Sequence, residues 1–252
     1  MSESVAGESL SSGGRRLQFW QRAVNKCLIF DADDTLWENN IYFLRAIEEF
    51  LDLIAPLAPD RSGVLQVLSE VEKELIPQGG YGTRNFLRAL QETFRRFYAG
   101  PDGWAYFQGM EQIGERLRSH PLELLPGVAS ILQTLRHSHR LMLFTKGDPE
   151  EQSGKVKRSG LQDYFDCVDI VEEKNTLAYQ RLIRDRQLLP QSTFMIGNSP
   201  RSDVSPALAA GLWAIYIPHR YTWELEHEQI EPHPRLLVAS SIHEIPSLLT
   251  RF

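Results

Sequence analysis

The chain has 252 residues, with 27 Lys and Arg against 33 Asp and Glu, so its formal net charge is −6. A chain of this length can bury a sizeable core, either as one large domain or as a core domain with a smaller inserted one. The acidic balance argues against a nucleic-acid or membrane-surface protein, because such proteins present a basic face to phosphate groups. The two cysteines, Cys27 and Cys167, exclude a disulfide framework and favour a reducing, cytoplasmic location.

The amino-terminal segment and the hydropathy pattern refine this picture. Residues 1–16 are rich in Ser, Gly and Glu, which predicts a disordered tail and no signal peptide. A run of about 18 apolar residues, which a membrane-spanning helix requires, does not occur. We therefore expect a protein with neither a membrane nor a nucleic acid as partner, present as a monomer or a homodimer.

Residues 27–30 (Cys-Leu-Ile-Phe) are apolar at every position, which predicts a strand buried on both faces, as in a parallel sheet. From residue 39 to residue 121 the apolar positions instead recur every three or four residues, which predicts helices without strands. Proline and glycine residues punctuate this stretch between the predicted helices. It is interpreted as an all-helical domain.

After residue 121 strands and helices alternate. Helices are predicted near 126–136, 149–159, 176–187, 204–210 and 242–249, and strands near 141–144, 167–171, 194–196, 213–217 and 236–238. Alternation of this kind is typical of an α/β fold with a doubly wound, Rossmann-like parallel sheet. The expected domains are a core of residues 17–38 and 122–252 and an inserted helical domain of residues 39–121.

Polar residues follow the predicted strands at the edge where ligands bind in such sheets. Asp31 and Asp33 come directly after the first strand, and two carboxylates packed together repel unless a cation neutralises them. A hard divalent cation with oxygen ligands, Mg²⁺ above all, would do so. A solvated acidic turn is the alternative.

Three further strand ends carry candidate groups. Thr145 and Lys146 precede a predicted helix and can bind an anion such as phosphate, although a threonine near a helix start is commonly a cap. Lys174 precedes the next helix, where most lysines are merely solvated. Asn198 and Asp203 offer oxygen atoms after another apolar strand, and ordinary turn chemistry is the alternative there.

These residues, taken in chain order, resemble the haloacid dehalogenase superfamily. Asp31-Ala32-Asp33-Asp34-Thr35-Leu36 is similar to the first motif of that family, and Thr145 and Lys174 match the second and third. The segment from Gly197 to Asp203 matches the fourth motif, and the helical stretch between the first and second motifs matches the family's inserted cap. The resemblance implies a Mg²⁺-dependent phosphohydrolase that acts on a small phosphorylated metabolite through an aspartyl-phosphate.

The resemblance also implies roles. Asp31 would attack phosphorus and Asp33 would act as general acid and base. Thr145 and Lys174 would hold the phosphoryl oxygens. Mg²⁺ would be held by Asp31, the backbone carbonyl of Asp33, Asn198 and Asp203, although family phosphatases usually carry Asp at the position of Asn198. The dehalogenases of the family lack the carboxylate that Asp33 provides here.

Substrate choice is expected to reside in the inserted helical domain. Residues 79–85 (Gly-Gly-Tyr-Gly-Thr-Arg-Asn) are the segment best suited to reach the site, with Tyr81 and Arg84 as substrate contacts beside Lys146. A plain turn between helices is the alternative. Three other functions remain open at this point: a sugar phosphomutase, a haloacid dehalogenase and a non-catalytic interaction protein.

Overall fold

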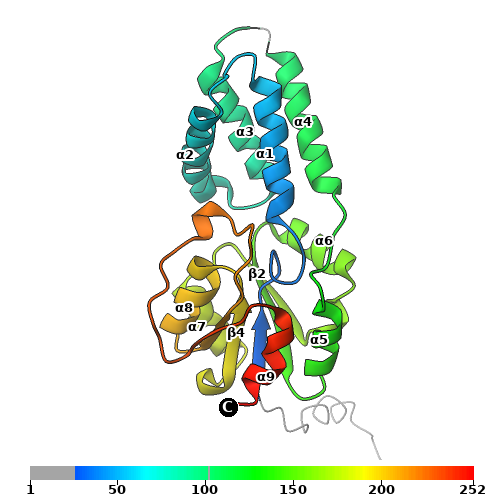
Figure 1. The fold of residues 1–252 in the computed structure, drawn as a ribbon, viewed down its shortest axis with the longest axis vertical. Helices are drawn as coiled ribbons and strands as arrows, with labels where there is room; N and C mark the ends of the chain where they lie inside the picture. The colour runs from blue at the N-terminus through cyan, green and yellow to red at the C-terminus, as the bar shows by residue number, and fades with distance from the viewer. Residues whose placement is uncertain (1–25, 102) are drawn as a thin grey trace, which may run out of the picture.

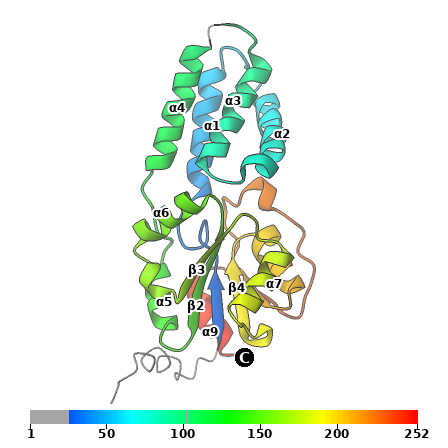
Figure 2. The same cartoon turned by 180° about the vertical axis from the view of Figure 1, so that it is seen from behind.

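The computed structural model of the protein describes residues 26–101 and 103–252. Within these residues a six-stranded parallel sheet has the strand order β3-β2-β1-β4-β5-β6, and helices cover both of its faces (Figures 1 and 2). The fold class predicted from the sequence, a doubly wound Rossmann-like sheet, is confirmed. The tail expected at residues 1–16 lies outside the described residues.

Strand β1 occupies the centre of the sheet and pairs with β2 on one side and β4 on the other. Leu28 and Phe30 pack into the core on one face, whereas Cys27 and Ile29 pack into the core on the other. This explains why the strand is apolar at every position. The strands are β1 (Cys27–Phe30), β2 (Arg140–Lys146), β3 (Cys167–Val171), β4 (Thr193–Gly197), β5 (Trp213–Tyr216) and β6 (Leu236–Val238).

The helices of the sheet domain divide between its two faces. Helices α5 (Val128–Leu135), α6 (Pro149–Ser159) and α9 (Ile245–Leu249) contribute to one core, and α7 (Thr176–Asp185) and α8 (Ser205–Ala209) to the other. Short helical turns are η2 (Gln162–Tyr164), η3 (Pro190–Ser192), η4 (Pro200–Val204), η5 (Glu224–Glu226) and η6 (Ile242–Glu244). The helix predicted over 242–249 is thus divided into η6 and α9. In the described parts of the chain, no helix has both the length and the apolar character needed to cross a bilayer.

Helices α1 (Asn40–Ile54), α2 (Arg61–Gly79), α3 (Thr83–Phe97) and α4 (Trp104–Ser119) form a separate helical block above the carboxyl ends of the strands (Figure 1). The block has a hydrophobic core of its own, centred on Phe50, Val64, Leu90 and Met110. Pro77, which the sequence suggested as a separator between helices, lies inside the last turn of α2.

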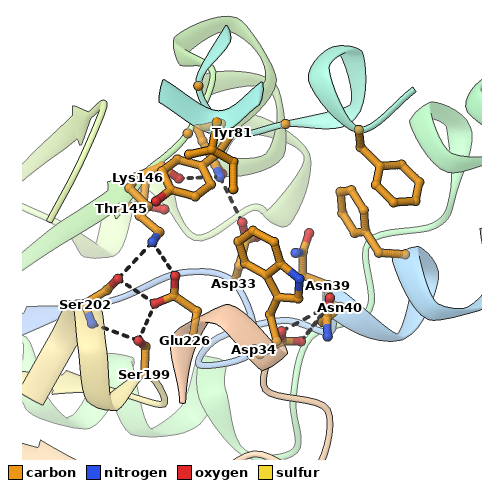
Figure 3. Close-up of a pocket in the computed structure, with 18 of the residues that line it drawn as sticks. Asp33, Asp34, Asn39, Asn40, Tyr81, Thr145, Lys146, Ser199, Ser202 and Glu226 are labelled. Atoms are coloured by element: carbon orange, nitrogen blue, oxygen red, sulfur yellow. Dashed lines mark hydrogen bonds and ion pairs between the residues drawn. The ribbon is translucent and has the colours of Figure 1, made fainter. Parts of the chain in front are cut away.

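Two connecting segments join the helical block to the sheet and pair with each other. The backbone N–H of Leu125 donates to the carbonyl of Leu36 at 2.9 Å, and that of Glu38 donates to Glu123 at 2.9 Å. At the start of α1, the carboxylate of Asp34 accepts the backbone N–H groups of Asn39 and Asn40 (Figure 3). These contacts fix where α1 leaves the sheet, because they satisfy backbone donors that the first turn of a helix leaves free.

The start of α3 is capped from the sheet domain. The backbone N–H and the hydroxyl of Thr83 donate to the carboxylate of Glu151 on α6, at 2.9 and 3.2 Å. Thr83 is the first residue of the helix, and the carboxylate of Glu151 serves as its cap. Gly82 precedes it with φ +116°, a conformation that favours glycine, and a Cβ there would lie 3.0 Å from the Glu151 carboxylate.

We predict that Glu151→Ala lowers the free energy of unfolding by about 1 kcal/mol, because it removes the acceptor that caps α3. Glu150→Ala is the matched control, since Glu150 is exposed in the same first turn of α6. Urea denaturation followed by circular dichroism measures both. Equal effects of the two substitutions would show that the contact with Thr83 does not stabilise the protein.

Candidate active site

A cavity lies between the carboxyl ends of the strands and the helical block. Its floor is formed by polar side chains at or just beyond the carboxyl ends of β1, β2, β3 and β4 (Figure 3). β1 and β4 are neighbours in the sheet but their connections run to opposite sides, which is where doubly wound sheets bind ligands. The floor residues are Asp31, Asp33, Asp34, Thr145, Lys146, Lys174, Asn198, Ser199, Ser202 and Asp203.

At the centre of the floor is the ammonium group of Lys174, whose side chain is almost completely buried. Its Nζ donates to Asp31 Oδ1 at 2.6 Å, to the carbonyl of Phe144 at 3.2 Å, and to Asp203 Oδ1. Burial alone would lower the pKa of Lys174, but the carboxylates of Asp203 and Asp31 raise it above its usual value. Lys174 is therefore charged and joins the ends of three strands.

Two buried carboxylates facing a single ammonium leave one negative charge without compensation. Burial raises the pKa of Asp31 above its usual value, although Lys174 opposes this. Burial and the charge of Asp31 together raise the pKa of Asp203 to about 7. A divalent cation at this position would offset the excess negative charge and favour both ionised forms.

Oxygen atoms suited to such a cation converge beside Lys174. The hydroxyl of Thr35 lies 3.0 Å from Asp31 Oδ2 and 3.1 Å from Asn198 Oδ1, so both oxygens lie around one point. The amide of Asn198 is oriented by Thr222, whose hydroxyl accepts its Nδ2–H at 3.1 Å. Carboxylate and amide oxygens are the ligands that Mg²⁺ prefers, and this donor set fits that ion. Asp203 differs, because its two oxygens accept from Lys174 and from the Ser199 N–H.

Asp33 occupies a different environment from Asp31. Its carboxylate accepts Lys155 Nζ at 2.9 Å, Gln152 Nε2 at 2.8 Å and Trp37 Nε1 at 2.7 Å. Burial would raise the pKa of Asp33, but Lys155 and the other donors hold it below its usual value. The two carboxyl groups after β1 are thus pulled apart, Asp31 toward Lys174 and Asp33 toward α6.

Thr145 and Lys146, the residues expected to bind phosphate, lie beside a second group of polar side chains. The hydroxyl of Thr145 is buried and makes no hydrogen bond with other described residues, so it is free to donate to a ligand. Lys146 forms an ion pair with Glu226, donates to Ser202 at 2.9 Å and lies 4.1 Å from the centre of the Tyr81 ring (Figure 3). Tyr81 in turn donates its hydroxyl to Glu173 at 2.6 Å.

The structure adds residues that the sequence analysis did not select. Glu226 accepts from Lys146, Ser199 and Ser202, and these donors outweigh its burial and lower its pKa. Trp223 packs edge-on against Tyr81, with ring centres 6.1 Å apart, and lines the cavity. Both residues lie in the segment after β5, which carries no motif that predicts a functional residue.

Gln152 and Lys155 carry a signal that could have been recognised. They are three residues apart on α6, so they share one helix face, and α6 begins directly after the strand end that carries Thr145. Arg84, in contrast, is exposed and does not line the cavity. We therefore do not retain Arg84 as a substrate contact, whereas Tyr81, Lys146, Thr145 and Lys174 line the cavity as expected.

Asp34, Glu38 and His219 form a further polar group beside the floor, with candidate ligand atoms within 4.8 Å of one another. His219 lies 3.3 Å from Glu38 and 3.7 Å from Asp34. Burial lowers the pKa of His219 despite the neighbouring Glu38. Since Asp34 already accepts two backbone N–H groups of α1, the group serves to hold that helix to the segment after β5.

Comparisons with known proteins found similar sequences and similar structures. The sequence model described as "Hydrolase: haloacid dehalogenase-like hydrolase" matches residues 25–211. The chain is 26% identical to the pyrimidine 5'-nucleotidase YjjG of Escherichia coli K12, over 89% of this chain and 97% of that protein. It is 27% identical to the N-acylneuraminate-9-phosphatase of Mus musculus, over 66% of each chain. A haloacid dehalogenase-like family hydrolase from Xanthomonas campestris has a similar structure, with a TM-score of 0.79, 28% identity, and coverage of 90% of this chain and 91% of that one.

We predict that Lys155→Met lowers the free energy of unfolding by about 3 kcal/mol at neutral pH, because Asp33 keeps its buried charge without its ammonium partner. The loss of stability in this variant should shrink as the pH falls, since protonation of Asp33 then removes the unpaired charge. The pKa of Asp33 is lowered in the folded protein, so the ion pair contributes most above the usual carboxyl range and is lost in acid.

Urea denaturation at several pH values measures this difference. Lys157→Met is the control, because Lys157 is an exposed lysine on the same helix. The double variant Lys155→Met/Asp33→Asn should regain most of the lost stability. A cost that is independent of pH and of Asp33 would contradict the ion-pair assignment.

Proposed function

The chain belongs to the haloacid dehalogenase-like hydrolase family, and on that premise we propose that it is a Mg²⁺-dependent phosphatase. The substrate would be a small phosphorylated metabolite, hydrolysed through an aspartyl-phosphate. The observation that carries the proposal is the pair of carboxyl groups after β1, which are held by different lysines, Asp31 by Lys174 and Asp33 by Lys155. A carboxyl group that acts as nucleophile and one that acts as acid and base need different pKa values, and therefore different environments.

In the first step, a carboxylate oxygen of Asp31 attacks phosphorus and the bond to the leaving oxygen breaks, which gives an acyl phosphate on Asp31. Asp33 donates a proton to the departing oxygen. An approaching phosphate dianion repels the Asp33 carboxylate and so favours the protonated form that this step needs. Thr145 and Lys174 would hold phosphoryl oxygens, with Lys146 next to them.

In the second step, Asp33 accepts a proton from water, and the water oxygen attacks the phosphorus of the acyl phosphate, which releases inorganic phosphate and restores Asp31. The ionised form of Asp33, favoured by Lys155, is the form that accepts this proton. Mg²⁺, held by Asp31, the Asp33 backbone carbonyl, Asn198 and Asp203, would neutralise charge on the phosphoryl group when bound.

The helical block, within residues 39–121, is proposed to act as the cap that selects the leaving group. Its residues Tyr81 and Phe86 line the same cavity as the strand-end residues, which supports this role. The names of the related proteins, a pyrimidine 5'-nucleotidase and an N-acylneuraminate-9-phosphatase, support a small organic phosphate as substrate. The free cysteines Cys27 and Cys167 support a cytoplasmic location.

The reaction class is tested by Mg²⁺-dependent release of inorganic phosphate. The panel would contain 4-nitrophenyl phosphate, pyrimidine nucleoside 5'-monophosphates, N-acylneuraminate 9-phosphate and hexose phosphates. Net phosphate release is expected. Transfer between two positions of one sugar without release would identify a phosphomutase, and halide release from a 2-haloacid would identify a dehalogenase. No turnover of any kind would favour a non-catalytic protein.

We predict that Asp31→Asn lowers phosphatase kcat by more than about a thousandfold, because the neutral amide is a poor nucleophile. The fold should persist, since Lys174 keeps its ion pair with Asp203. Phosphate release and circular dichroism measure the two properties, with the exposed Asp163→Asn as the control. Substantial activity in a folded Asp31→Asn protein would remove Asp31 from the nucleophile's role.

Asn198 gives a prediction for the metal. Replacement by Asp adds a negative charge beside Asp31 and should strengthen Mg²⁺ binding by about 1–2 kcal/mol, after desolvation losses. The Mg²⁺ concentration for half-maximal activity should therefore fall about tenfold. Gln162→Glu, which adds the same charge at an exposed turn before β3, should leave it unchanged. An unchanged or higher requirement in Asn198→Asp would mean that Asn198 does not contribute to the metal's electrostatics.

A further inference from the structure

The cavity has an upper wall that is chemically unlike its floor. The wall is formed by Phe43 and Leu44 of α1, Leu75 and Ile76 of α2, and Phe86 of α3, together with neighbouring apolar side chains. Leu44 is 38% exposed, although it lies on the apolar face of α1. A phosphate group finds no hydrogen-bond donor on such a wall. The wall instead suits an apolar group, because covering apolar surface is favourable by about 25 cal/mol per Å².

One carboxyl group interrupts this wall. Glu72 lines the cavity from α2, three and four residues before Leu75 and Ile76, and therefore on the same helix face. Within residues 26–101 and 103–252, the side-chain carboxyl of Glu72 has neither a hydrogen bond nor an ion pair. Burial raises its pKa to about 7. A carboxyl in such surroundings is costly to the fold unless a ligand supplies the missing donor.

Asn85, a polar side chain beside Phe86, is already engaged. Asn85 donates its amide Nδ2–H to the carbonyl of Gly80 at 2.7 Å and accepts from Arg88 at 3.3 Å. In the rest of the helical block, carboxylates such as Glu48, Glu49 and Glu74 pair with arginines at the surface. Glu72, in contrast, has a carboxyl group that is unpaired among the described residues, and it lines the cavity.

The aromatic residues of the wall indicate the shape of the group it receives. Phe43 and Phe86 meet edge to face, with ring centres 5.1 Å apart and planes at 78°. Perpendicular rings offer one face and one edge to a neighbour, an arrangement that favours a flat ring over a branched or polyhydroxylated chain. A polyol would leave its hydroxyls unpaired against the wall, and an anionic group would be repelled by Glu72.

From this juxtaposition we infer that the leaving group of the substrate is an aromatic or heteroaromatic ring that carries an N–H donor, and that Glu72 accepts that donor. The inference rests on the proposed phosphatase function, since the same cavity joins the wall to Asp31 and Thr145. The ring packs against Phe43 and Phe86 while the ester phosphate lies on the polar floor. Glu72 is a specificity-determining residue in this arrangement and takes no part in the bond changes.

The test compares esters that differ in one group. In 4-(2-aminoethyl)phenyl phosphate a charged ammonium replaces the terminal methyl of 4-propylphenyl phosphate. In 4-aminophenyl phosphate a neutral amino group replaces the methyl of 4-methylphenyl phosphate. The wild-type protein should prefer the nitrogen-bearing ester of at least one pair by about tenfold in kcat/KM. Glu72→Leu should lose this preference while turning over the methyl-bearing ester at least as well as the wild type does.

The controls separate this inference from the reaction itself. Glu115→Leu removes an exposed carboxylate of α4 and should retain the preference. Glu72→Gln, which conserves size, should lose most of it and tests the inference if Glu72→Leu is misfolded by circular dichroism. Turnover of the esters without a preference in either pair, or a preference that survives in both Glu72 variants, would overturn the inference alone. Absence of turnover of every aryl ester, with hydrolysis of another member of the phosphate-release panel, would also overturn the inference alone. Absence of turnover of the whole panel would overturn the proposed function and this inference with it.

Discussion

The site depends on one buried ammonium group, that of Lys174, between the carboxylates of Asp31 and Asp203. The three residues follow β3, β1 and β4, so their contact requires the central strands to be parallel and correctly ordered. Burying one such charge without a partner would cost several kcal/mol, and the three charges are tolerable only together. Because the three groups carry a net negative charge, the arrangement that stabilises the fold also forms the proposed cation site and contains the proposed nucleophile.

A second lysine gives the neighbouring carboxyl group a separate environment. Lys155 holds Asp33 on the side of α6, and the same helix caps α3 through Glu151. Helix α6 therefore contacts both the floor of the cavity and the helical block. The polar floor and the apolar wall come from different parts of the chain, so the proposed phosphate chemistry and the proposed selection of the leaving group are assigned to different residues of one cavity. The carboxyl of Glu72 remains a local cost to stability, as is common at functional sites.

Much of the floor could be predicted from the sequence, because it follows from strand ends. Asp31, Thr145, Lys174, Asn198 and Asp203 lie at the carboxyl ends of strands or in the segments that follow them, and parallel strands bring such residues to one edge. Other features of the site were not obtained from the sequence. Arg84 was selected from a glycine-rich segment, but it lies in the first turn of α3, whose inward residues include Phe86 and Leu90. Helical periodicity places Arg84 with Arg88 on the outer face. Glu226 and Glu72 lie in segments without a motif, and only the packing of loop and helix against the cavity brings them to it.

The central claim, that Asp31 forms a covalent bond with phosphorus, can be tested by trapping the intermediate. The protein would be mixed with a substrate found by the phosphate-release panel, quenched during turnover and treated with borohydride, which reduces an acyl phosphate to an alcohol. Peptide mass spectrometry then locates the reduced residue, with a sample quenched before substrate addition as the control. Homoserine is expected at position 31 and nowhere else among the acidic residues of the cavity. Conversion of Asp33 or Asp203 instead, or rapid phosphate release with residue 31 unmodified throughout, would contradict the central claim.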